Sequence, residues 1–213
     1  MFVPGKFAAD LTALDALFAR DGFITLVSTV AGEPFASHLP VLYQREGERV
    51  VLHGHLARAN AQWRELAAQT ALAIVHGPHA YISPTWYARP ETSVPTWNYT
   101  VAHLYGQVRL IEEPAALQAL VAAQAADYEA GIGSDWRFPD SAPDTLHELA
   151  GIVGFEFAAT RIQVKHKLNQ HHDPASLGGA IAGLQRHGNH EGREIAALMA
   201  AVLAERTGGS IPP

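Results

Sequence analysis

The segment from Leu52 to Asn60 (LHGHLARAN) combines residue types that bind phosphate groups. A run of apolar residues ends at Gly54, and a helix is predicted to begin soon after it, with Arg58 in its first turn. Free N–H groups at a helix start, beside a guanidinium, favour a bound phosphate. The fixed glycine spacings of dinucleotide-binding and P-loop motifs are absent, so an ordinary turn between a strand and a helix is the alternative.

Two histidines of this segment, His53 and His55, lie two positions apart. On a strand such a pair shares one face and can chelate a metal ion. The segment holds no Asp or Glu, so a third ligand would have to come from another part of the chain. Since 12 histidines in 213 residues also produce such pairs by chance, we expect no metal site.

Four aromatic residues with hydrogen-bonding edges follow one another within two short segments: Trp86, Tyr87, Trp97 and Tyr99. Glycines, prolines and hydroxyl-bearing residues lie between them. Flat apolar walls with polar edges are what a planar heterocycle needs. The same residues could instead form an aromatic cluster that closes one end of a β-barrel.

A third group of candidates is the segment Lys165–Gln170 (KHKLNQ), inside a stretch from 157 to 172 that contains no acidic residue. Lys165 and Lys167 share one face of a strand, and two amides follow, Asn169 and Gln170. Such a set can hold an anionic ligand that forms hydrogen bonds. The alternative is a solvated basic edge that discourages pairing with another strand.

The sequence contains no Gly-x-Ser-x-Gly, no His-Glu-x-x-His and no closely spaced pair of acidic residues in an apolar setting. Cysteine is absent, which excludes disulfides, thiolate metal ligands and cysteine nucleophiles. The three groups are therefore interpreted as binding sites. Any redox or transfer chemistry would have to come from a bound cofactor.

Hydrophobic spacing and turn residues predict the elements that position these groups. Helices are predicted at 11–20, 61–69, 115–129, 173–184 and 191–205, and a short one, with a capping box at 141–144, before residue 150. Strands are predicted at 23–30, 35–43, 49–54, 71–75, 81–82, 94–111 and 152–164. Pro40 inside the second strand predicts an edge strand or a bulge.

This order of elements favours an α+β fold around a small antiparallel barrel of six or seven strands. Helices do not alternate with strands, which argues against a doubly wound parallel sheet. We expect a single domain over residues 1–213, with a helical C-terminal extension from about residue 173. With 48% apolar and 17% charged residues the chain can bury a core, which excludes intrinsic disorder.

The charge of the chain is acidic and unevenly distributed. There are 15 Lys and Arg residues against 21 Asp and Glu, a formal net charge of −6. Residues 112–156 contain a dense acidic stretch in which Arg137 is the single base. Proteins that bind duplex DNA normally carry a basic surface. We therefore expect no tight direct binding to DNA.

No stretch of the sequence approaches the roughly 18 consecutive apolar residues of a membrane span. The first residues, MFVPGK, lack the charged region followed by an apolar stretch that marks a secretory signal. We therefore expect a soluble, cytoplasmic protein.

Taken together, these segments resemble the PaiB-like FMN-binding proteins, whose name reflects a role in negative transcriptional regulation. The resemblance lies in a Met-x-Val-Pro start, Ser37–Pro40 (SHLP), Gly54-His55 with Ala57–Asn60 (ARAN), Gly77–Pro84 (GPHAYISP) with Trp86-Tyr87, and Val94–Tyr99 (VPTWNY). The two aromatic segments are long and unusual, which makes the resemblance specific. It implies a split β-barrel like that of pyridoxamine-phosphate oxidases and flavin reductases, with FMN at a homodimer interface.

The resemblance also implies roles for the candidate residues. His38, Leu39 and Pro40 would lie along the isoalloxazine ring, and the phosphate would meet the turn that carries His55, Ala57, Arg58 and Asn60.

Trp97 and Asn98 would approach the flavin from a neighbouring strand or from the other subunit. Near the last strand the family commonly has Lys-x-Ser-Gln-Asn, where this chain has Lys167-Leu-Asn-Gln-His171. Lys167 and Gln170 therefore keep their places, while Asn169 and His171 depart from the pattern.

Two functions follow from the resemblance. One is an FMN-binding transcriptional regulator or redox sensor without turnover. The other is a flavin-dependent oxidoreductase, an FMN reductase or oxidase acting on a small molecule, in which the cofactor performs the redox step. A third, haem binding or haem degradation in a split barrel, would use histidines among His171, His172, His187 and His190, although the motif of such proteins is not matched.

Overall fold

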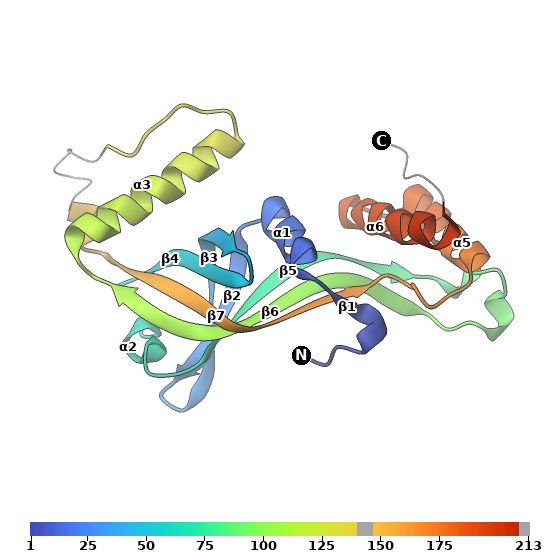
Figure 1. Cartoon of the computed structure of the whole chain (residues 1–213), viewed down its shortest axis with the longest axis horizontal. Coiled ribbons are helices and arrows are strands. Elements are labelled where there is room, and N and C mark those ends of the chain that lie inside the picture. The colour runs from blue at the N-terminus through green and yellow to red at the C-terminus, as the bar shows by residue number, and fades with distance from the viewer. Residues whose placement is uncertain (140–146, 209–213) are drawn as a thin grey trace. The chain divides into compact units, whose positions relative to one another are not determined.

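The computed structural model describes residues 1–139 and 147–208 and contains one antiparallel sheet (Figure 1). Its strands are β1 (Ala8–Ala9), β2 (Phe23–Val30), β3 (Glu33–Glu46), β4 (Arg49–Ala57), β5 (Ala71–Ile82), β6 (Thr96–Ile111) and β7 (Ile152–Lys167). They are ordered β1-β7-β4-β3-β2-β5-β6, and β6 also pairs with β7. This second pairing closes the six strands from β2 through β7 into a ring, which confirms the predicted α+β barrel.

The helices and short 3-10 turns are η1 (Gly5–Phe7), α1 (Leu11–Arg20), α2 (Trp63–Leu66), η2 (Pro84–Trp86), η3 (Pro90–Thr92), α3 (Pro114–Gly131), α5 (Pro174–His187) and α6 (His190–Thr207). Side chains cap several of them: Asp10 precedes α1, Glu113 precedes α3 and Asp173 precedes α5. Each cap accepts hydrogen bonds from the N–H groups of the first turn, which lack partners inside the helix. None of the helices in the described residues is both long and apolar enough to cross a lipid bilayer.

Helix α2 is shorter than the helix predicted at 61–69, and Arg58, which was predicted to lie in its first turn, instead belongs to a turn that precedes the helix. The side chain of Gln69 accepts a hydrogen bond from the N–H of Thr29 and donates one to its carbonyl, each at 2.7 Å. These bonds hold the chain beyond Leu66 against β2 in place of a longer helix. The capping box predicted at 141–144 lies outside the described residues, and a short helical segment at 147–149 follows it.

The chain divides into two compact units. Unit 1 comprises residues 1–17, 76–102 and the described part of 163–213. Unit 2 comprises residues 18–75 and the described part of 103–162. Strands β5, β6 and β7 each contribute residues to both units.

The core of unit 2 is built by alternate residues of its strands. Ile24 and Leu26 of β2, Leu52 of β4, and Phe155 and Phe157 of β7 are fully buried. Burying one such side chain contributes about 1.5–3 kcal/mol.

The two phenylalanines of β7 require glycines on neighbouring strands. A Cβ at Gly54 would lie 2.7 Å from the Phe155 ring, and one at Gly106 would lie 2.7 Å from the Phe157 ring. The glycines therefore let the strands pass close to the two rings.

Strand β3 lies between β4 and β2, so the edge strand, one of the two alternatives predicted from Pro40, is wrong, while the bulge stays a prediction. The pairing explains how a proline fits there. Residues 33–40 of β3 pair with β2, whereas residues 41–46 pair with β4. Pro40 has no N–H to donate, and it lies where β3 changes partner.

Unit 1 has its own apolar core, in which α5 and α6 pack together with residues from the end of β5 and the turn after it (Figure 1). The core includes Ile82, Leu177, Leu184, Ile195 and Met199, all nearly or fully buried. Helices are present at both of the predicted C-terminal positions, as α5 and α6, and both contribute residues to this core.

Candidate functional site

Strands β2 and β3 of unit 2 turn one side into the core and the other outward. Leu39 is buried in the core, so a ligand on the outward side could reach it only through the main chain. His38 and Pro40 belong to the outward side, opposite Thr25 and Phe23 of β2. The Thr25 hydroxyl lies 3.1 Å from His38 Nδ1, and the ring of Phe23 lies nearly parallel to the imidazole at 6.5 Å. With Phe23 51% exposed, this side offers a flat apolar surface beside an imidazole edge.

Gln124 of α3 joins two of the expected residues, His55 and Pro40. Its Oε1 lies 2.9 Å from His55 Nδ1, and its Nε2 donates to the Pro40 carbonyl at 3.2 Å. Because the amide N–H group serves the carbonyl, Oε1 acts as acceptor and the proton of neutral His55 belongs on Nδ1. His55 Nε2 is then left as a hydrogen-bond acceptor.

Gln124 was missed in the sequence. Its signal is the helical spacing of Leu117, Leu120 and Gln124, which are the buried residues of α3. A glutamine on the buried side of a helix needs a polar partner, and here the partners belong to the candidate site.

Arg58 connects the turn after β4 to the start of β7 by hydrogen bonds. Its Nε and Nη2 donate to the carbonyls of Ala150 and Ile152, each at 3.0 Å, and its Nη1 donates to Glu112 at 3.1 Å. A guanidinium has five N–H donors. Bonds to the described residues use three of them, which leaves two that could serve an oxyanion.

The same turn is closed by Asn60. Its amide donates to the Ser37 hydroxyl at 2.8 Å, and its Oδ1 accepts from the N–H of Gln62 at 2.9 Å. The main-chain N–H groups of Ala59 and Ala61 are donors in none of these bonds. Since Ala57 and Ala59 are small and exposed, an anion could approach the main chain here.

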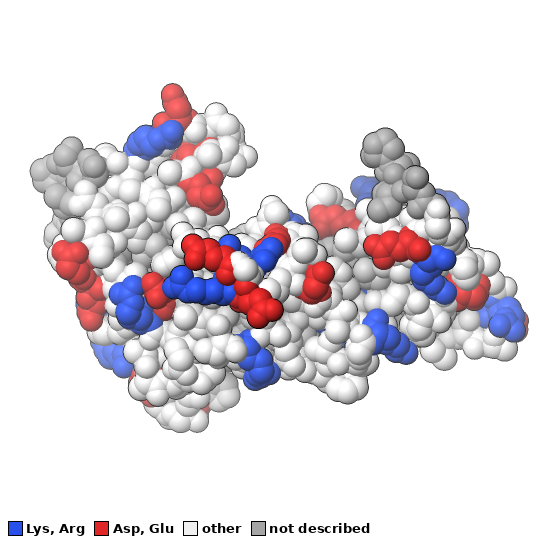
Figure 2. Space-filling view, in the orientation of Figure 1, with Lys and Arg blue, Asp and Glu red and all other residues white. Residues whose placement is uncertain are grey.

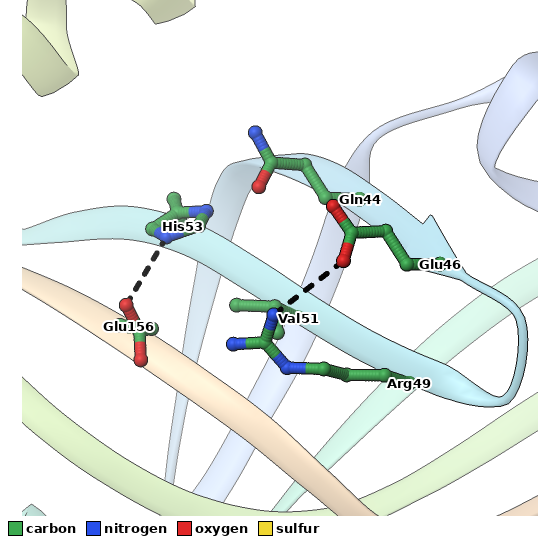
Figure 3. A pocket seen from close by; sticks show the side chains of 6 residues that line it. All are labelled: Gln44, Glu46, Arg49, Val51, His53 and Glu156. Carbon is green, nitrogen blue, oxygen red and sulfur yellow. Dashed lines mark ion pairs between the residues drawn. The ribbon is translucent and has the colours of Figure 1, made fainter.

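His53 lies in a separate polar hollow of about 150 Å³ on β3, β4 and β7, shown in Figure 3. Its Nε2 is 3.5 Å from Glu156, which also accepts a hydrogen bond from Arg109 at 2.8 Å. The bond from Arg109 holds the pKa of Glu156 below its ordinary value. His53 and His55 thus have different partners, and the described residues contain no group of three or more potential metal ligands.

The other four expected residues lie in unit 1. Lys167 Nζ donates to the Trp97 carbonyl at 2.7 Å and also to the Thr96 hydroxyl, so Lys167 and Trp97 are brought together. Burial lowers the pKa of Lys167. Asn98 is fully buried and its Nδ2 contacts Met199 Sδ at 3.2 Å, so its side chain belongs to the core of unit 1.

Gln170 closes the turn after β7. Its Oε1 accepts from the N–H of Leu168 at 2.8 Å, and its Nε2 donates to the His166 carbonyl at 2.6 Å. Asn169, one of the departures from the family pattern, is buried with a φ of 60° and donates to the Tyr87 hydroxyl at 2.8 Å. Asparagine tolerates this left-handed conformation better than most residues, which gives it a structural reason to be here.

The four histidines considered as haem ligands do not form one group. The rings of His171 and His172 are 4.4 Å apart, and burial lowers the pKa of both. His187 instead stacks on Trp86 at 6.4 Å, and His190 pairs with Glu194 at 2.9 Å.

Comparison with known proteins shows a match to a protein family. A family model described as "Putative FMN-binding domain" matches residues 1–161. The chain is 35% identical over 182 residues to "Protease synthase and sporulation protein PAI 2" of Bacillus subtilis, covering 84% of this chain and 86% of that protein.

Two solved structures share the fold at low sequence identity. The flavocytochrome Anf3 of Azotobacter vinelandii has a TM-score of 0.56 and 18% identity, covering 74% of this chain and 67% of that one. An FAD and heme binding protein of Mycobacterium smegmatis has a TM-score of 0.56 and 20% identity, covering 76% of this chain and 73% of that one.

Proposed function

The chain belongs to this family of FMN-binding domains, and from that premise we propose that FMN lies on the outward side of β2, β3 and β4 in unit 2, where its redox state serves a regulatory function. The observation that carries the proposal is the set of contacts made by Gln124. It holds Pro40, which the resemblance assigns to the flavin ring, and His55, which the resemblance assigns to the phosphate end.

The residues present fit the chemistry of FMN. Phe23 and the imidazole of His38 provide a flat wall for the ring system. The N–H groups of Ala59 and Ala61 and the two remaining donors of Arg58 suit the phosphate. His55 Nε2 is an acceptor, which suits a hydroxyl of the ribityl chain better than the phosphate to which the resemblance assigns His55.

When bound, FMN supplies the redox chemistry, and the protein's part is to orient it and to exclude water. The proposal rests on the unit 2 residues. Trp97, Asn98, Lys167 and Gln170 remain predictions of the resemblance.

We propose further that the protein is a homodimer and that the second copy covers the outward side of β2 and β3. Phe23 is half exposed there and is an apolar side chain that a partner would bury. Light scattering at micromolar concentration should show a species of twice 22.9 kDa. A single species of 22.9 kDa would contradict the dimer.

The regulatory function is supported by the name of the Bacillus subtilis relative, which refers to protease synthesis and sporulation. The test is to reconstitute the protein with FMN, add NADH or NADPH under air, and follow the flavin absorbance and oxygen uptake. A sensor binds FMN and shows no sustained oxygen consumption. Continuous turnover would favour the oxidoreductase instead, and failure to retain FMN would overturn both.

A further inference from the structure

Unit 1 contains a groove of about 500 Å³ that is separate from the unit 2 residues on which the FMN proposal rests, although its lining includes Trp97, which the resemblance assigns to the flavin. Residues of β5, η2, β6, α5 and α6 form it, together with the turn between α5 and α6. Its aromatic lining consists of His79, Tyr81, Trp86, Trp97 and His187. Part of this lining lies beyond residue 161, where the match to the FMN-binding family ends.

The aromatic rings form two groups on the walls of the groove. On the strands, the rings of His79 and Tyr81 each lie 6.0 Å from Trp97. On the helical side, His187 stacks on Trp86 at 6.4 Å and 11°. Trp97 is 53% exposed and Tyr81 45% exposed, so both present ring surface to a ligand. Exposed aromatic rings gathered in one hollow are typical of a binding site.

Two glycines of α5 allow Trp86 to take its place in this wall. A Cβ at Gly183 would lie 2.2 Å from the Trp86 ring, and one at Gly179 would lie 2.0 Å from the Trp86 carbonyl. Any larger residue at either position would displace the tryptophan. The wall is therefore fixed by the packing of α5, which is the pre-organisation that a stacking site requires.

The polar groups of the groove are suited to a ligand that donates hydrogen bonds rather than to an anionic ligand. His79 Nδ1 lies 3.1 Å from the carboxylate of Glu191, so an acid stands at the edge. No lysine or arginine occurs among the lining residues that the structure describes. A phosphate ester would find no lysine or arginine in this lining, whereas an N–H group on a ring could donate to the carboxylate of Glu191.

From the stacked walls, the acidic edge and the volume we infer that this groove binds a planar nitrogen heterocycle of one to three rings that carries N–H donors and no phosphate. Its volume is within the range of small-molecule sites, which is about 300–1,000 Å³. The lining of this groove lies in unit 1, whereas the residues that carry the FMN proposal lie in unit 2, so the inference assigns Trp97 to this ligand instead of to the flavin.

The inference is tested with two probes, neutral adenine and cationic 3,6-diaminoacridine, titrated into the full-length protein with FMN absent and with FMN saturating. Fluorescence anisotropy follows the acridine, and calorimetry follows adenine. Both probes are expected to bind saturably, with equal affinity in the two conditions. Tyr81→Ala and His187→Ala should each weaken both probes by about five- to tenfold, because each removes one stacking ring.

Trp136→Ala is the matched control, since Trp136 is 49% exposed and lies in unit 2. It should leave probe binding unchanged, and circular dichroism checks that each variant is folded. Binding of the cationic dye alone, equal binding by Tyr81→Ala, or displacement of the probes by FMN would each overturn the inference. FMN titration of Tyr81→Ala keeps the two proposals apart, because FMN affinity should not change in this variant.

Discussion

The side chain of Gln124 lies 2.9 Å from His55, measured from Oε1 to Nδ1, and so connects helix α3 to strand β4. The same side chain reaches the carbonyl of Pro40 on β3. One buried amide thus fixes both a histidine ring and the strand beside it. Because Gln124 Oε1 accepts a hydrogen bond, it selects the tautomer of neutral His55 that carries its proton on Nδ1.

Replacing Gln124 by leucine should destabilise unit 2 and weaken FMN binding. The substitution leaves His55 Nδ1 and the Pro40 carbonyl without their partner, and an unsatisfied buried polar group costs about 1–3 kcal/mol. Urea unfolding should show a loss of this size. Gln185→Ala, at an exposed position on α5, is the control and should change stability by less than about 0.5 kcal/mol. Equal stability of Gln124→Leu and Gln185→Ala would show that the hydrogen bonds from Gln124 to His55 and Pro40 contribute nothing to stability.

Arg58→Ala should weaken FMN binding by about ten- to a hundredfold and leave riboflavin binding nearly unchanged. A hydrogen bond to a charged group contributes about 1.5–3 kcal/mol, and only FMN carries the phosphate. Calorimetric titration of both ligands is the measurement. Arg64→Ala, a nearby exposed arginine that stacks on Trp63, should bind FMN as the natural chain does. Equal losses for FMN and riboflavin would contradict the phosphate assignment.

The pair formed by Arg109 and Glu156 should stabilise the protein in a pH-dependent way. The hydrogen bond from Arg109 lowers the pKa of Glu156 from its ordinary value of 4.5, so the unfolded state binds the proton more tightly. The stabilisation is therefore fully present above pH 4.5 and is lost as pH falls through the lowered pKa of the folded state. Arg109→Gln should be less stable than the natural chain at pH 6, and the difference should shrink toward pH 3.

Unfolding in urea at several pH values measures this difference. Arg193→Gln, exposed on α6, serves as the control and should show a difference that does not depend on pH in this range. A difference for Arg109→Gln that stays constant down to pH 3 would argue against the assigned role of Glu156.

Much of the fold could be predicted from local patterns, because strand alternation and helix caps act over a few residues. The helices predicted at 11–20 and from 173 illustrate this, since Asp10 and Asp173 cap α1 and α5. The position of Pro40 could not be predicted, because β3 changes partner at that residue and pairing between distant strands leaves no local signal.

The candidate site shows the same division. The turn at 57–60 was found from its residue types, whereas the partners of Arg58 come from residues 112, 150 and 152, far along the chain. The burial of Asn98 also depends on Met199, a hundred residues away in sequence, and no motif records that contact.

We predict no sequence-specific binding to duplex DNA tighter than about micromolar at physiological salt, the range in which nonspecific binding begins. On the face shown in Figure 2, Lys and Arg side chains are scattered among Asp and Glu and form no continuous basic surface. A mobility-shift assay with the protein's own upstream DNA, with and without FMN, is the test. A nanomolar complex that weakens steeply with salt would show direct DNA binding and contradict this prediction.

Hydrogen–deuterium exchange of the protein with and without FMN tests the location of the cofactor most directly. If FMN lies on the outward side of β2, β3 and β4, its addition should slow exchange at residues 36–42 and in the turn at 57–61, where N–H groups meet the ring and the phosphate. Riboflavin should protect 36–42 and leave the turn unchanged. Protection confined to unit 1, above all at residues 79–97 and 184–192, would contradict the central claim.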